Sequence, residues 1–213
     1  MVCRECNKTI AKNSNYCKYC GTKVEKAEKV KAPVIEEAQT GLLYKVIEVT
    51  KKEADEGVFG DIYYAKATAL RRRAVPTWGV FLNEYEQGGG PLIDIGTHAL
   101  DLTLWTMNNY KPKYCVGTTY HKLNNQTETG NAWGDWDPEK FTVEDSAFGF
   151  VVMENGATIN LESAWALNVA DPREAVTSFC GTLAGADMDK GLRINGVAHN
   201  AQYEFKPNLD AKG

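Results

Sequence analysis

The chain has 213 residues, of which 43% are hydrophobic and 24% charged, and its formal net charge is −4. This composition is typical of a globular protein with one sizeable domain and room for a small second one. The negative charge argues against a nucleic-acid-binding protein. No apolar run reaches the roughly 18 to 20 residues that span a bilayer, and the N-terminus lacks the hydrophobic stretch of a signal peptide. We therefore expect a cytoplasmic protein without a membrane partner.

Charge is distributed unevenly along the chain. Residues 1–24 carry five basic side chains against one acidic side chain, whereas residues 41–213 carry 16 basic and 23 acidic ones. Residues 25–40 hold mixed charges, alanines and one proline, a composition typical of a linker. We expect three parts: a small basic unit at 1–24, a linker at 25–40 and a large domain at 41–213.

Two C-x2-C pairs mark the first unit, with ten residues between the pairs. In a reducing compartment, such pairs indicate metal ligands before disulfides. Two of them supply the four thiolates of one tetrahedral Zn²⁺, and about 24 residues need such a metal because they cannot bury a core. The unit resembles the short zinc ribbons of many microbial proteins. We predict a structural, non-catalytic zinc site, with disulfides or unligated cysteines as the alternatives; its ligands are Cys3, Cys6, Cys17 and Cys20.

A helix and a strand are predicted after the linker. Apolar residues recur at helical spacing from residue 40, where Thr40 is suited to cap the start and Gly57 to close the end. Residues 61–73 then form a strand rich in β-forming residues that ends in three arginines. The first of these, Arg71, is either a solvated strand end or a contact for substrate or phosphate.

The segment 88–105, GGGPLIDIGTHALDLTLW, places ionisable residues in a helix that is otherwise apolar. Asp94, His98, Asp101 and Trp105 follow the spacing of one helical stripe. Two interpretations stay open from these residues alone. The stripe lines a cavity, or Asp94 caps the helix start while His98 is a half-buried histidine without a function.

The remaining sequence predicts strands. Asn155-Gly156 is a hairpin signal between two of them, and Cys115 and Cys180 stand singly in apolar surroundings that predict core positions. Residues 123–140 form a polar loop with two tryptophans. The strands are predicted within 113–123, 143–167, 175–189 and 191–205. The fold class is therefore α+β: a large, predominantly antiparallel open sheet in meander order, with helices on one face.

Residues 41–205 resemble the C-terminal domain of the Gfo/Idh/MocA family of NAD(P)-dependent oxidoreductases. The resemblance is carried by EGVFGDIYYAKATALRRRAVPTW, by GGGPLIDIGTHALDLTLW with its pattern D-x-G-x-H-x-x-D-x-x-x-W, and by VEDSAFGFVVMENGATINLESAWAL. It implies a substrate domain whose sheet usually mediates oligomers. It also implies that Asp94 contacts substrate hydroxyls and orients His98, which exchanges a proton with the reacting hydroxyl. Asp101, Trp78 and Arg71 complete the predicted substrate-binding residues.

The family's cofactor motifs do not occur in this sequence. No G-x-G-x-x-G follows a strand, and the Glu-Lys-Pro motif with the family's catalytic lysine is missing, so no residue is assigned to NAD(P) binding. A first hypothesis is the substrate-binding half of a sugar or polyol dehydrogenase, which acts only with a separate Rossmann-domain protein. A second is a module that binds a carbohydrate-like hydroxylated molecule without turnover. A third is an interaction protein with a sheet-mediated homo-oligomer and a recruiting zinc ribbon. A fourth is a truncated or recombined reading frame without a selected function.

Overall fold

The computed structural model describes residues 5–6, 8–9, 16–23 and 37–209. The chain divides into two compact units, residues 1–34 and 35–213. No helix in the described part of the chain has the length and apolar character to cross a bilayer. The second unit contains α1 (Glu37–Asp55), β1 (Ile62–Leu70), α2 (Glu84–Gln87), the π-helical turn η1 (Leu92–Gly96), α3 (Thr97–Met107), β2 (Pro112–Tyr120), β3 (Ser146–Met153), β4 (Thr158–Ala164), β5 (Arg173–Gly181), β6 (Ala184–Asp187), β7 (Arg193–Ala198) and β8 (Ala201–Phe205).

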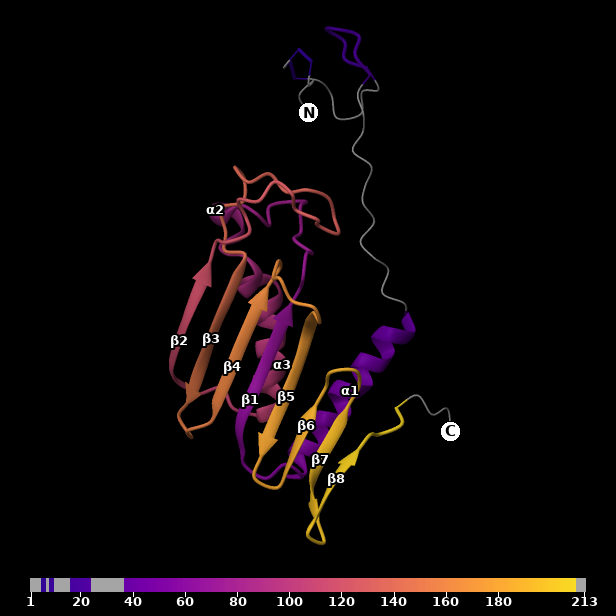
Figure 1. Cartoon of the computed structure of the whole chain (residues 1–213), viewed down its shortest axis with the longest axis vertical. Helices are drawn as coiled ribbons and strands as arrows, with labels where there is room; N and C mark the ends of the chain where they lie inside the picture. Colours follow the sequence, from indigo (N-terminus) through magenta and orange to yellow (C-terminus); the bar gives the residue numbers. More distant parts are fainter. Residues whose placement is uncertain (1–4, 7, 10–15, 24–36, 210–213) are drawn as a thin grey trace. The chain divides into compact units, whose positions relative to one another are not determined.

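The strands form one eight-stranded sheet in the order β2-β3-β4-β1-β5-β6-β7-β8 (Figure 1). In the described residues, β1 pairs with β4 in parallel, and the other neighbouring strands pair antiparallel. The predicted open, predominantly antiparallel sheet is confirmed. The predicted meander is wrong at one place, because β1 is inserted between β4 and β5.

Helix α1 begins earlier than predicted. It starts at Glu37, so Thr40 lies inside the helix and is not its cap, and the start falls within the segment predicted as linker. The predicted closure is confirmed: Gly57 adopts a φ of 78°, and its N–H donates to the carbonyl of Ala54 over 3.1 Å. A left-handed residue just past a helix end is a common terminator, and glycine adopts it without strain.

Small side chains bring α3 close to the centre of the sheet. Ala65, Ala67 and Ala69 alternate along β1 toward the helices, and each is fully buried. The hydroxyls of Thr103 on α3 and Thr177 on β5 lie 2.9 Å apart in this buried layer. Figure 1 shows α3 crossing behind the middle strands. The core therefore lies on one face of the sheet.

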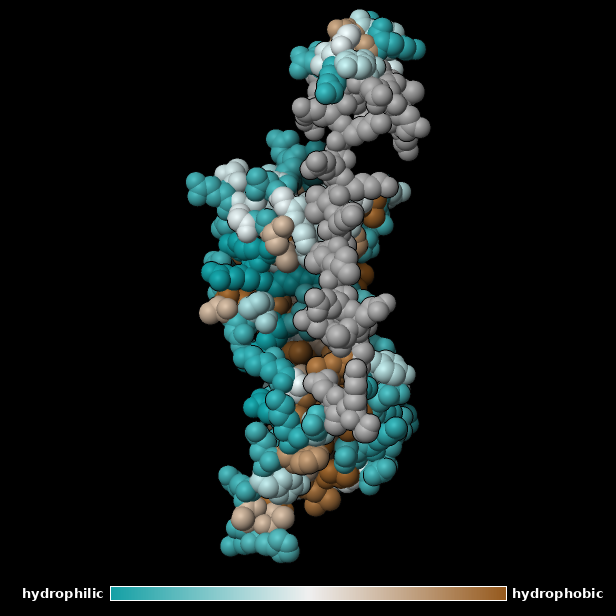
Figure 2. Space-filling model, turned by 90° about the vertical axis from the view of Figure 1, so that its right-hand side faces the viewer, coloured by the Kyte–Doolittle hydropathy of each residue, from teal (hydrophilic) through white to brown (hydrophobic). Residues whose placement is uncertain are grey.

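The opposite face of the sheet carries exposed apolar and aromatic side chains. The pairing register places Tyr114, Val116 and Phe150 there, and their side chains are 50%, 57% and 40% exposed. Lys66 and Glu162 form an ion pair of 3.0 Å on the same face. Figure 2 views the domain from its α1 and β8 edge and shows hydrophobic side chains among hydrophilic ones at that edge. The sheet thus has one covered and one uncovered face.

The two single cysteines of the sheet are not core residues, contrary to the prediction. Cys115 and Cys180 are both exposed. Cys115 lies on β2, an edge strand whose residues are all exposed. Cys180 pairs in register with Tyr64 and so belongs to the uncovered face. Apolar neighbours in sequence did not reveal which face or strand would be covered.

Candidate functional site

Glycines at 88–90 allow a glutamate to fold onto the start of the following helical segment. The Glu144 carboxylate accepts hydrogen bonds from the N–H groups of Gly90, at 2.8 Å, and Leu92, at 3.3 Å. A Cβ atom at Gly90 would lie 2.1 Å from the Glu144 carbonyl oxygen, so only glycine permits this approach. Backbone donors at a helix start are suited to bind phosphate. Here they bind a side chain of the protein itself, and this glycine cluster does not fit a dinucleotide pyrophosphate.

The helix that follows begins with the π-helical turn η1. Its N-cap residue is Pro91, and the Asp94 carboxylate accepts from Trp165, so the interpretation of Asp94 as a helix cap is wrong. A Cβ atom at Gly96 would lie 3.0 Å from Ser163 Oγ, which means that the turn packs directly on β4. Single π turns recur at functional sites because they change the direction of the side chains around them.

Asp94 is held by residues that follow the two parallel strands. Trp165, one residue after β4, donates its Nε1–H to Asp94 Oδ2 over 2.8 Å. Arg71 follows β1 by one residue, and its Nη1 lies 3.8 Å from the same oxygen. The carboxyl ends of parallel strands meet at one edge of the sheet, which brings these two side chains together. The site is therefore built where the inserted strand β1 ends beside β4.

Arg71 is not a solvated strand end. Its side chain is 15% exposed and also pairs with the carboxylate of Glu174. Its guanidinium carbon lies 5.2 Å from the centroid of the Trp133 ring, a cation–π distance. Two carboxylates and an aromatic ring thus contact the guanidinium group. Arg71 therefore connects Asp94, Glu174 and Trp133 within the site.

The predicted aromatic residue Trp78 joins this cluster through Trp133. The two rings meet edge to face with centroids 5.1 Å apart, and Trp78 is 45% exposed. The Trp133 loop is fixed by Asn131, whose side chain exchanges two hydrogen bonds with the backbone of Val75 at 2.8 and 3.0 Å. The site therefore includes a partly exposed tryptophan pair next to an arginine and a carboxylate, a combination that suits hydroxylated ligands.

The other residues of the predicted stripe stand apart from this cluster. His98 and Asp101 are exposed on α3, and the described residues provide neither side chain with a hydrogen bond or ion pair. Trp105 lies near α1, with Lys51 Nζ 5.5 Å from its ring centroid. The structure thus groups Asp94 with Arg71 and Trp78. His98 and Asp101 are exposed to solvent, and Trp105 lies next to Lys51 of α1.

Two members of the cluster, Trp133 and Trp165, were not predicted as site residues. Trp133 stood out only as a tryptophan in a polar loop. Trp165 reads in sequence as an ordinary apolar residue at a strand end, and it is fully buried. A buried tryptophan needs an acceptor for its N–H, but sequence alone does not identify Asp94 as that acceptor.

A thiol cluster forms in the first unit. The sulfurs of Cys6, Cys17 and Cys20 lie within 4.8 Å of one another. The fourth predicted ligand, Cys3, lies outside the described residues. Burial opposes ionisation of the Cys17 thiol, yet hydrogen bonds from the backbone of Tyr19 and Cys20 lower its pKa overall. Because thiolates are the zinc-binding form of cysteine, the donor set fits a Zn²⁺ ion.

Comparison with known proteins confirms the resemblance seen in the sequence. Residues 47–185 match the family model described as the GFO/IDH/MocA C-terminal domain. The D-glucoside 3-dehydrogenase of Escherichia coli (strain K12) is 42% identical over 138 residues, which cover 65% of this chain and 39% of that protein.

Solved structures share the fold. An oxidoreductase domain protein from Kribbella flavida aligns with a TM-score of 0.61 at 18% identity. The alignment covers 79% of this chain and 45% of the Kribbella flavida chain. Levoglucosan dehydrogenase in complex with NADH and L-sorbose aligns with a TM-score of 0.61 at 16% identity, over the same shares. This chain therefore spans less than half the length of these relatives.

Proposed function

The chain belongs to the GFO/IDH/MocA oxidoreductase family, with its match in the C-terminal domain, and on this premise we propose that it is the substrate-binding half of a sugar- or polyol-type NAD(P)-dependent dehydrogenase. The observation that carries the proposal is the Asp94 carboxylate, which is bonded to Trp165 and lies beside Arg71. It stands four residues before an exposed histidine on the same helical segment.

Each residue has a role in this proposal. Asp94, held by Trp165 and Arg71, accepts hydrogen bonds from substrate hydroxyls. His98 exchanges a proton with the reacting hydroxyl, since an imidazole can both accept and donate a proton and this side chain is not engaged by other described residues. Trp78 offers a ring face to a sugar, and Asp101 adds an acceptor one turn beyond His98.

The nicotinamide cofactor acts only when a separate Rossmann-domain protein supplies its site. NAD(P) would accept or donate the hydride. No G-x-G-x-x-G motif follows a strand in the described residues, and the glycine cluster at 88–90 is occupied by Glu144. We therefore derive no reaction step within this chain alone.

A second candidate function is a non-catalytic module that binds a carbohydrate-like ligand or a protein. The observation that favours it is the thiol cluster in a compact unit of its own. In this function, a structural Zn²⁺ bound by Cys3, Cys6, Cys17 and Cys20 folds a small element that recruits a partner.

Ligand binding tests the proposed site. We expect calorimetric titration with methyl β-D-glucoside to show saturable binding, and Asp94→Asn to weaken it about tenfold or more, since hydrogen bonds to charged groups contribute ~1.5–3 kcal/mol. Asparagine keeps an oxygen that accepts from Trp165, so folding should persist, which thermal unfolding checks.

Glu154→Gln, an exposed change in the turn between β3 and β4, serves as the control and should bind like the parent chain. A lack of glucoside binding, or binding that Asp94→Asn leaves intact, would refute the proposed site.

Titration with NADH and NADPH tests the requirement for a separate cofactor domain. Micromolar binding of either cofactor by this chain alone would contradict it.

The uncovered sheet face is proposed to pair with a second copy of the chain. Large exposed apolar patches usually mark interfaces, and Tyr114, Val116 and Phe150 form such a patch over β2 and β3. We expect sedimentation velocity at high micromolar concentration to show an oligomer that Val116→Lys shifts toward monomer. Tyr85→Lys alters an aromatic residue that is 97% exposed on α2 and should leave the distribution unchanged. A parent chain that stays monomeric would contradict the interface.

A further inference from the structure

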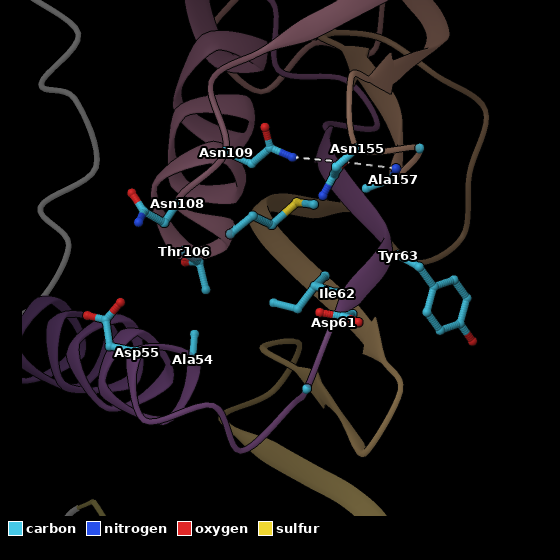
Figure 3. Close-up of a pocket in the computed structure, with 13 residues that line it drawn as sticks. Ala54, Asp55, Asp61, Ile62, Tyr63, Thr106, Asn108, Asn109, Asn155 and Ala157 are labelled. Carbon is cyan, nitrogen blue, oxygen red and sulfur yellow. Dashed lines mark hydrogen bonds between the residues drawn. The ribbon is translucent and has the colours of Figure 1, made fainter.

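A cavity lies at the other end of β1 from Asp94. Its volume is about 680 Å³, within the range of small-molecule sites. It opens where β1 begins, and β1 rises ~3.3 Å per residue, so the nine steps to Arg71 separate the two sites by roughly 30 Å. The cavity is lined by Ala54, Asp55, Gly60, Asp61, Ile62, Tyr63, Thr106, Met107, Asn108, Asn109, Asn155, Gly156 and Ala157 (Figure 3).

The charged side chains of the lining are all acidic. It contains the carboxylates of Asp55 and Asp61 and no lysine, arginine or histidine. Asp55 pairs with Lys51, which lies outside the lining, whereas Asp61 forms no ion pair within the described residues. Two helices also end here, α1 at Asp55 and α3 at Met107. Helix carboxyl ends carry partial negative charge, so the cavity favours a cationic group.

A buried hydroxyl in the lining lacks a partner. Thr106 is 2% exposed, and its Oγ1 forms no hydrogen bond. Two other buried threonines on these helices behave differently: Thr103 Oγ1 donates to the Ala99 carbonyl and Thr50 Oγ1 to the Val46 carbonyl, both at 2.7 Å. A buried polar group without a partner is destabilising. The Thr106 hydroxyl is therefore an uncompensated polar group in the wall of the cavity.

Amide groups complete the polar lining. Asn109 Nδ2 donates to Asn155 Oδ1 over 3.0 Å, and the same oxygen accepts from the Ala157 N–H over 3.1 Å. These bonds fix the Asn155 oxygen and leave its amide nitrogen for other acceptors. Asn108 has a φ of 48° at the end of α3 and is exposed at the rim. The cavity thus combines donors and acceptors for hydroxyl groups with carboxylates for an ammonium group (Figure 3).

From this combination we propose that the cavity binds a small hydroxylated primary amine. The ammonium group pairs with Asp61, and the hydroxyls bond to the asparagine amides. An organic cation fits better than a metal ion, because no three metal-ligating carboxylate, histidine or thiol groups cluster here among the described residues. This site is independent of the proposed dehydrogenase function.

Calorimetric titration of the full chain with D-glucosamine tests the proposal, with N-acetyl-D-glucosamine as the matched probe that lacks the positive charge. We expect saturable glucosamine binding, at least about tenfold weaker binding of the acetylated probe, and an equal loss in Asp61→Asn. Asp137→Asn, an exposed change in the 123–140 loop, should bind like the parent. Asp61→Asn should leave the binding of methyl β-D-glucoside unchanged, which separates this cavity from the Asp94 site.

A second pair of variants tests the role of the hydroxyl. Thr106→Val replaces this unpaired hydroxyl by a methyl group of similar size and should leave the melting temperature unchanged or higher, with glucosamine binding intact. Thr103→Val breaks the bond to Thr177 and should lower the melting temperature. No saturable glucosamine binding, equal binding of both probes, or an unchanged affinity in Asp61→Asn would overturn the proposal.

Discussion

We expect the purified chain to hold one Zn²⁺ and Cys17→Ser to abolish metal binding. Cys17 is the buried member of the thiol cluster, and its sulfur lies 3.6 Å from that of Cys6. Structural zinc contributes ~10–16 kcal/mol to the folding of small modules at neutral pH. The loss of one of four thiolates should therefore unfold residues 1–24. Metal analysis of both proteins measures the stoichiometry directly.

Two controls make this result specific. Cys115→Ser changes an exposed thiol on β2 and should retain the full zinc content. Chelation should leave the unfolding transition of residues 35–213 in place, because those residues form a separate compact unit. Zinc content near zero in the parent chain, or unchanged in Cys17→Ser, would show that the cysteines do not form this site.

Trp165→Ala is expected to be the most damaging single change in the sheet domain. Trp165 is fully buried, its ring packs against Phe81 and Phe141 with centroids 6.3 Å away in both cases, and it donates to Asp94. Truncation of a buried tryptophan costs ~3–5 kcal/mol. In a domain of this size that loss lowers the melting temperature by roughly 6–20 °C. Thermal unfolding followed by circular dichroism measures the shift.

Trp105→Ala provides the matched control. Trp105 is 39% exposed on α3, and its ring lies below the Lys51 ammonium group, so its loss should cost less than about 1 kcal/mol. Similar shifts in the two variants would show that burial and the bond to Asp94 do not distinguish these tryptophans.

The sequence allowed the strands and the main helix positions to be predicted, because their signals are local. Asn155-Gly156 marked the β3–β4 turn correctly, with Gly156 at a φ of 90°. The order of strands in the sheet is not a local property. The insertion of β1 depends on pairings such as Tyr64 with Thr158, almost a hundred residues later. No pattern within either segment specifies that partner.

The candidate site was predictable only in part for the same reason. Asp94 and His98 belong to one recognisable motif, whereas the groups that hold Asp94 come from two distant segments. For Arg71 the residues alone left a solvated strand end and a substrate or phosphate contact open, because its partners Glu174 and Trp133 lie about 60 to 100 residues away in sequence. The π-helical turn at Leu92–Gly96 was not predicted either, since the same residues are compatible with an ordinary helical turn.

The central position of β1 also determines the order in which the domain can assemble during translation. β1 leaves the ribosome before both of its neighbours, and its last pair with β4, Leu70 with Ala164, needs 94 more residues. At ~5–20 residues per second this takes roughly 5–20 s. Meanwhile β2, β3 and β4 can pair locally as they emerge, because each follows its neighbour in the chain. They then present an edge to which the earlier strand returns, and the second half of the sheet can add only after β1 is in place. Synthesis therefore includes an interval in which β1 has two unpaired edges, and this strand is the part of the nascent domain that most needs protection from aggregation.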